Sequence, residues 1–175
     1  MPETPERAKL SFVKEEMDTL QKLLSPVVDI ITLENPTRQQ VLSELPEQQI
    51  VHLACHGCIA DDPSQSSLYL RDWKTTPLTV SDLQSIDVKS ATFAYLSACH
   101  SSGSEAVNLL DESITLSSAI QLSGYLSVVG TLWRVVDKHS AEVARDVYSL
   151  MMSNGDLNIR RSAEAFALGI ACSKR

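Results

Sequence analysis

The sequence has few of the features that mark nucleic-acid-binding or membrane-spanning proteins. Its 15 lysines and arginines stand against 22 aspartates and glutamates, for a formal charge of −7 and a pI near 5.0. The basic residues form no patch, so we expect no nucleic-acid partner. No apolar run approaches the roughly 20 residues of a membrane span, and the opening "MPETPERAKLSF" is too polar for a signal peptide. We therefore expect a cytoplasmic protein with no membrane partner.

Cysteines are also few. Four cysteines in 175 residues do not indicate a disulfide framework, and a reducing compartment would keep them as thiols. The chain has no internal repeat and no low-complexity tract. A hydrophobic content of 43% is enough for a core, and the length predicts a single domain over residues 1–175.

Helix and strand patterns alternate along the chain. Apolar residues at helical spacing predict a helix from Leu10 to Leu24, and further helices at 36–45, 79–86, 114–122, 143–151 and 163–170. Short runs rich in branched residues predict strands at 27–33 ("VVDIITL"), 50–54 ("IVHLA"), 92–97 ("TFAYLS") and 126–130 ("LSVVG"), with a small extended piece at 66–70. This alternation predicts an α/β fold, in which helices cover both faces of a mostly parallel sheet.

Two of the predicted strands are followed by reactive side chains. His56 and Gly57 come after "IVHLAC", and Cys99 follows "TFAYLSA" forty-three residues later. Ligand and catalytic groups in such sheets gather beyond the carboxyl ends of the strands. We therefore expect His56 and Cys99 to lie at one edge of the sheet.

A neighbouring imidazole can take the proton of a thiol, which makes cysteine plus histidine the minimum set for nucleophilic catalysis. The tetrahedral intermediate also needs donors for its oxyanion, and backbone N–H groups serve this role. We expect the N–H groups of Gly57 and Cys99 to act as these donors, with Gly57 allowing a tight turn.

The motifs "HLACHG", "YLSACHS" and "LLDESITLSSAIQLSGYLSVVGTLWRVVDKHSA" resemble the CHAT domain, a caspase-like cysteine peptidase module related to separase. The resemblance implies a caspase-like three-layer sandwich, endopeptidase activity on a protein substrate, and a dyad of His56 and Cys99. It also implies that Asp137, after the "LW" tryptophan, lines the pocket for a basic substrate side chain. A regulatory tetratricopeptide-like repeat region in a longer parent protein is an implied partner, and no cofactor or metal is implied.

Several residues carry alternative interpretations. Trp133 is a core aromatic or a wall of the substrate pocket, and Asp111 complements a helix dipole or contributes to specificity. His52 is expected to pack or to bond the backbone. Cys55 and Cys58 form a C-x-x-C motif, for which a zinc site and a redox pair are the alternatives. No second ligand pair for zinc follows, and "IADDPSQSS" is typical of a loop rather than of the helix that a thioredoxin-like motif needs. A non-catalytic caspase-like interaction module is the alternative to a peptidase.

The resemblance further implies a strand before the first helix and another after the last one, and "MPETPERAKL" has no apolar run to form the former. We therefore expect a fragment or truncated product of a longer protein. Alone, such a chain would be marginally stable, prone to association and weakly active or inactive. A sheet without this interior strand must leave backbone groups unpaired or close "VVDIITL" against "IVHLA".

Overall fold

The computed structural model describes the chain apart from residues 59, 98, 101–109, 131–136, 154 and 173–175. The side chains of residues 99–100, 110–115, 137, 153 and 170–172 also lie outside the described part.

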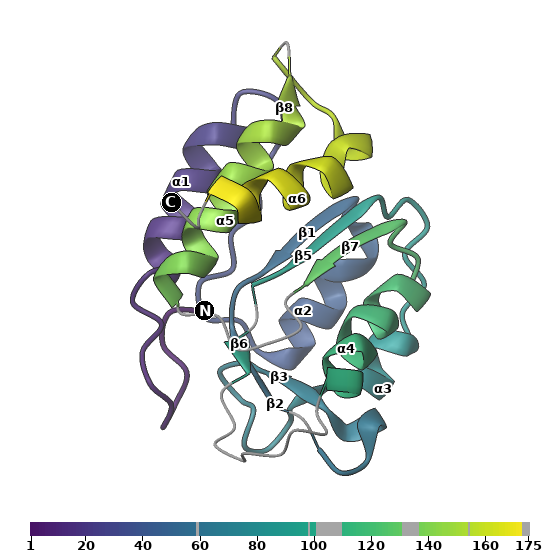
Figure 1. Cartoon of the computed structure of the whole chain (residues 1–175). Helices are drawn as coiled ribbons and strands as arrows, with labels where there is room; N and C mark the ends of the chain where they lie inside the picture. Colours follow the sequence, from purple (N-terminus) through teal and green to yellow (C-terminus); the bar gives the residue numbers. More distant parts are fainter. Residues whose placement is uncertain (59, 98, 101–109, 131–136, 154, 173–175) are drawn as a thin grey trace.

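A parallel sheet of three strands lies at the centre of the fold (Figure 1). Its order is β1-β5-β7, and its strands are β1 (Ile50–Leu53), β5 (Phe93–Leu96) and β7 (Ser127–Gly130). The central strand pairs in register with both neighbours, Ile50 and Ser127 both lying opposite Phe93. The strands predicted at 50–54, 92–97 and 126–130 are thereby confirmed.

Helices cover both faces of this sheet (Figure 1). Because side chains alternate along a strand, Phe93 and Tyr95 face one core and Ala94 and Leu96 face the other. The first core is closed by α1 (Val13–Leu24), α5 (Asp137–Met151) and α6 (Ser162–Cys172). The second is closed by α2 (Arg38–Glu44), α3 (Val80–Gln84) and α4 (Leu110–Leu122). The α/β class with a parallel sheet flanked by helices is confirmed.

Local sequence explains where several helices begin and end. The side chains of Thr37 and Thr79 accept hydrogen bonds from the third residue of α2 and α3, and that residue's side chain returns a bond to each cap. Gly124 follows α4 with a φ of +121°. A Cβ at Gly124 would lie 2.6 Å from the Val88 carbonyl oxygen, so glycine is required both by conformation and by space.

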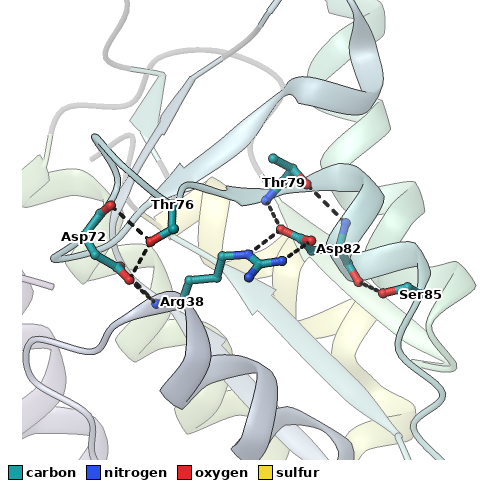
Figure 2. A network of polar contacts seen from close by, with 6 residues as sticks. All are labelled: Arg38, Asp72, Thr76, Thr79, Asp82 and Ser85. Atoms are coloured by element: carbon teal, nitrogen blue, oxygen red, sulfur yellow. Dashed lines mark hydrogen bonds and ion pairs between the residues drawn. The ribbon is translucent and has the colours of Figure 1, made fainter.

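An ion pair connects α2 to α3 (Figure 2). Arg38 donates through Nε and Nη2 to the two oxygens of Asp82, at 2.9 and 2.5 Å. The hydrogen bonds from Arg38, followed by those from Thr79, lower the pKa of Asp82 from 3.8 to about 2. Asp72 accepts the backbone N–H of Arg38 at 3.0 Å. The start of α2, the helix that leads into β1, is thereby attached to the next helix on the same face.

A second sheet, which the sequence did not predict as a sheet, lies beyond the carboxyl ends of β1 and β5. Its order is β4-β3-β2-β6, and its strands are β2 (His56–Cys58), β3 (Ser67–Tyr69), β4 (Leu78–Thr79) and β6 (Cys99–His100). β3 is the small extended piece expected at 66–70. The chain leaves β1 and β5 and enters β2 and β6 within three residues in each case.

The strand predicted at 27–33 is wrong. Residues 29–33 have no regular secondary structure, and Ile30, Ile31 and Leu33 are 37%, 61% and 39% exposed. The segment has strand propensity, but none of the described strands pairs with it, and a ladder needs a partner. β1 consequently has only one neighbour, β5, among the described strands.

The remaining short elements connect the ends of helices and strands. They are η1 (Leu45–Glu47), η2 (Pro63–Gln65), η4 (Ile159–Arg161) and the hairpin of β8 (Met152–Ser153) with β9 (Asp156–Leu157). Within the described residues, no helix is long and apolar enough to span a bilayer.

Candidate active site

The second sheet brings the backbones of His56 and Cys99 side by side. β2 and β6 are parallel, and His56 lies directly opposite Cys99 in their register. This arrangement follows from the first sheet, because β1 and β5 are parallel neighbours whose chains continue into β2 and β6. The expected meeting of the two residues beyond the strand ends is confirmed for the backbone, while the Cys99 side chain lies outside the described part.

The His56 imidazole is buried and held by a backbone carbonyl. The residue is 3% exposed, and Nε2 lies 2.7 Å from the carbonyl oxygen of Ala8. A carbonyl oxygen only accepts, so Nε2 carries the hydrogen and donates it. Nδ1 is buried and has no hydrogen-bond partner among the described residues. In the neutral ring this nitrogen has the lone pair that can accept a proton.

Ala8 is held in place by aromatic contacts of the residues before it. The Arg7 guanidinium carbon lies 4.8 Å from the ring centroids of both Tyr69 and Trp73, and Arg7 Nη2 donates to the Tyr69 hydroxyl at 3.3 Å. Trp73 Nε1 donates to the Pro5 carbonyl oxygen at 3.1 Å. Tyr69 lies opposite His56 across the β2–β3 pair. The same residue thus borders the histidine and holds the segment that orients it.

The Tyr69 hydroxyl stays protonated at neutral pH. Burial, and then a hydrogen bond with the Cys58 thiol, raise the pKa of Tyr69 to about 12.

Cys55, the other cysteine of the C-x-x-C motif, is 3% exposed and belongs to the hydrophobic core beside α2 and α4. The described residues contain no group of three or more His, Cys, Asp or Glu side chains that could hold a metal ion.

Gly57 lies within strand β2, between β3 and β6, rather than in the tight turn that we expected. It is not among the glycines with positive φ, and a Cβ there would meet its nearest neighbour at 3.8 Å. Glycine is therefore not required at this position by backbone conformation or by space.

A buried polar network lies on the α1 and α5 side of the strand ends. Glu16, 3% exposed, accepts from His52 Nε2 at 3.0 Å and from the Ser97 hydroxyl at 3.3 Å. His52 also contacts the Tyr148 hydroxyl at 3.3 Å and stacks on Tyr95 with ring centroids 4.9 Å apart. The packing role that we expected for His52 is thereby confirmed, and its hydrogen bonds go to side chains rather than to the backbone.

The network extends to the first turn of α5. Ser97 and Ser140 share a buried hydrogen bond of 2.7 Å. Ser97 precedes Cys99 by two residues, and Ser140 follows Asp137 by three. The beginning of α5 is thus attached to the segment that leads to Cys99.

The other predicted pocket residues are only partly placed. Asp137 is the first residue of α5 and Asp111 is the second residue of α4, but their side chains lie outside the described part. Trp133 lies outside the described residues altogether. The structure therefore does not test whether these three residues line a pocket.

The main contact that sequence reasoning missed is the carbonyl of Ala8. A backbone oxygen that orients a side chain 48 positions away has no sequence signature, because any residue supplies the same oxygen. The only related signal is the aromatic pair Tyr69 and Trp73, and its contact with Arg7 is visible only in three dimensions.

Comparison with known proteins identifies one family. The family model of the CHAT domain matches residues 2–165 of the chain. No curated protein matched, and no solved structure matched.

Proposed function

We propose that this chain, which belongs to the CHAT domain family, is a cysteine endopeptidase in which His56 and Cys99 form the catalytic dyad. The single observation that carries the proposal is the state of His56. Its Nε2–H is bonded to Ala8, its buried Nδ1 has no partner among the described residues, and the backbone of His56 lies opposite that of Cys99 in the register of β2 and β6. A buried polar atom without a hydrogen-bond partner lowers the stability of the folded protein, and a catalytic role is one reason why such an atom is retained.

The proposed reaction uses Nδ1 as the general base. It accepts the Cys99 thiol proton while sulfur attacks the scissile carbonyl carbon, and the resulting oxyanion is held by the backbone N–H of Cys99. Gly57 lies inside β2 with a paired strand on each side, so its N–H is not assigned as a second donor. The imidazolium then protonates the departing amine nitrogen, leaving a thioester on Cys99. His56 next takes a proton from water, whose oxygen attacks the thioester and releases the acid and the thiol.

In this mechanism the Ala8 carbonyl is a positioning group. It fixes the tautomer with hydrogen on Nε2, and it faces the imidazolium with an acceptor when Nδ1 becomes protonated. The described contacts of Arg7 with Tyr69 and Trp73 support this role, since they hold the chain directly before Ala8.

Family membership also supports a caspase-like three-layer arrangement for the sheet and its helices, and a protein as substrate. We assign Asp137 to the pocket for a basic substrate side chain, next to Trp133 and Asp111. The bond between Ser97 and Ser140 supports this assignment, because it holds the start of α5 beside the segment before Cys99. Asp137→Asn should reduce cleavage after arginine and lysine by more than tenfold relative to apolar residues, whereas an equal loss on all substrates would make Asp137 structural.

Labelling with a thiol-reactive peptide inhibitor, followed by mass spectrometry, tests the dyad. We expect modification of Cys99, with Cys55 and Cys58 as internal references because one is buried and the other half-buried. His56→Ala should slow labelling of Cys99 by at least tenfold, and Cys58→Ser should leave it unchanged. Equal rates at Cys99 in the wild type and in folded His56→Ala would contradict the base role.

Peptide-library digestion with wild type and Cys99→Ala separates the peptidase from a non-catalytic module. The peptidase requires cleavage that disappears in Cys99→Ala. Cleavage by neither protein, from a chain with a cooperative unfolding transition, would favour the interaction module.

A further inference from the structure

Ser97 is held through both its backbone and its side chain. It lies directly after β5, and its N–H donates to the carbonyl oxygen of Leu53, the last residue of β1, at 2.9 Å. Its side chain is buried and contacts Glu16 of α1 and Ser140 of α5. Ser97 therefore attaches the end of β5 to the end of β1 and to two helices.

The hydrogen bonds of the Ser97 hydroxyl have a defined direction. A carboxylate oxygen only accepts, so the single hydroxyl hydrogen of Ser97 goes to Glu16 Oε2 at 3.3 Å. The Ser97 oxygen then accepts the hydrogen of the Ser140 hydroxyl, 2.7 Å away. The chain of bonds thus runs from Ser140 on α5 through Ser97 to Glu16 on α1.

A second chain of bonds links α5 to the same carboxylate. Burial raises the pKa of Tyr148 well above 10, so its hydroxyl keeps its hydrogen and can donate to His52 Nδ1, 3.3 Å away. His52 Nε2 donates to Glu16 Oε1 at 3.0 Å. Ser140 and Tyr148 are both buried and lie roughly two helical turns apart on α5. α5 is therefore attached to Glu16 at two levels, and the bond of Ser140 is the one that reaches the segment leading to Cys99.

Both ends of the bond between Ser97 and Ser140 lie close to residues of the proposed site. Cys99 follows Ser97 by two residues, so their Cα atoms are at most about 7 Å apart. Asp137 precedes Ser140 by three residues, so the two lie on one side of α5, about 4.5 Å apart along its axis. The bond therefore spans the gap between the segment of Cys99 and the helical turn of Asp137.

Cys99 has a separate attachment to His56. β6 pairs with β2 through backbone groups, and Cys99 lies opposite His56 in that register. Loss of the bond between the two serines should therefore leave the dyad residues side by side and release the start of α5.

We infer that Ser140 and Ser97 are positioning residues for specificity, which fix the distance between Cys99 and the pocket for a basic side chain at Asp137. Glu16 is their buried anchor. The inference rests on the proposed function, which gives Asp137 and Cys99 their roles. An enzyme gains rate by holding the substrate in register with the reacting group, and a displacement of about 1 Å can remove much of that gain. A substrate bound at Asp137 reaches Cys99 in register only while this bond holds α5 in place.

Two thiol reagents with different requirements test the inference on the full chain. Iodoacetamide alkylates Cys99 without using a pocket, whereas a peptidyl ketone inhibitor with arginine at the cleaved position needs both Cys99 and Asp137. Ser140→Ala should slow labelling by the arginine inhibitor at least fivefold and change the iodoacetamide rate less than twofold, as measured by mass spectrometry of the Cys99 peptide. Ser97→Ala should act in the same way. The double variant should be no slower than Ser97→Ala alone, because the two substitutions remove one shared bond.

Ser162→Ala is the matched control. Ser162 is buried, begins α6 and shares a hydrogen bond of 2.8 Å with Ser127, so it too joins a helix serine to a strand serine. Ser127 lies opposite Phe93, the first residue of β5, at the end of the sheet away from Cys99. Ser162→Ala should leave both labelling rates within twofold of wild type.

The outcomes separate this inference from the proposed function. If Asp137→Asn reacts with the arginine inhibitor as fast as wild type, Asp137 does not line the pocket and both are overturned. If Asp137→Asn slows that reaction while folded Ser140→Ala and Ser97→Ala do not, the positioning inference alone fails. Equal slowing of both reagents, or equal slowing by Ser162→Ala, would assign the serine bond to general stability and would also overturn the inference.

Discussion

Strands β5 and β1 are neighbours of equal length with very different surroundings. All four residues of β5 are buried, and it pairs with β1 on one side and β7 on the other. All four residues of β1 are only half-buried, and they line a groove of about 710 Å³ together with residues 28–33. Both sequences favour a strand, so the difference arises from neighbours. The comparison indicates that β5 is stabilised by hydrogen bonds to a strand on each side. β1 has such bonds on one side only among the described strands and depends on side-chain contacts on the other.

The two strands should differ most in the free energy of unfolding that is lost when one large side chain of each is removed. Phe93, 0% exposed, packs edge to face against Tyr148 with ring centroids 5.8 Å apart. Phe93→Ala should lower the free energy of unfolding by about 3–5 kcal/mol through the cavity it leaves. Ile50→Ala, in the half-buried strand, should cost about 1–2 kcal/mol. Urea unfolding measures both, and equal losses would show that β1 is as enclosed as β5.

The contact that replaces a neighbour for β1 is the bond between His52 and Glu16. Glu16→Ala removes the buried acceptor of His52 and Ser97 and should cost about 3 kcal/mol, since one half of a buried polar pair is left alone. Glu16→Gln retains an acceptor and should lose less than half as much. Thermal unfolding of the two variants checks this expectation. A Glu16→Ala protein as stable as wild type would mean that β1 needs no such anchor.

The ion pair of Arg38 with Asp82 holds the helix that leads into β1, and its contribution should depend on pH. The pKa of Asp82 is lowered from 3.8 to about 2. The folded state therefore favours the carboxylate, and the stabilisation is complete above the unfolded pKa and is lost as the pH falls from about 4 through 2. Asp82→Asn should cost roughly 1–2 kcal/mol at neutral pH, after allowance for solvent screening.

Urea unfolding of wild type and Asp82→Asn from pH 7 to pH 2.5 measures this dependence. The two stabilities should converge toward the acid end. A constant difference across that range would show that the loss comes from packing or from the helix cap and not from the charge of Asp82.

The smallest effect should come from the wall of the groove. Ile31 is 61% exposed, and Ile31→Thr should change the free energy of unfolding by no more than about 0.5 kcal/mol. Ile50→Ala, in strand β1, should lower the free energy of unfolding by more, because β1 is paired with β5 whereas residues 29–33 have no strand partner among the described residues. A loss above about 1 kcal/mol in urea unfolding would indicate that residues 29–33 already pack against a partner in solution.

Local patterns were sufficient for most elements. The helices capped by Thr37 and Thr79, the strands of the parallel sheet and the glycine after α4 follow from periodicity and from cap or turn chemistry, which act over a few residues. The same patterns indicated that His56 and Cys99 follow parallel strands, and the register opposite each other follows from that.

Only the tertiary structure decided the rest. Residues 27–33 have strand propensity, but a strand needs a neighbouring edge, and no short-range signal encodes whether one is present. The Ala8 carbonyl reaches His56, and Glu16 reaches His52, through contacts between residues 36 to 48 positions apart. Chain folding sets such distances, and a backbone oxygen is identical in every residue. The sequence by itself determined most of the elements and the reactive residue types, while the fold alone determined the tautomer of His56 and which side of β1 has a neighbouring strand.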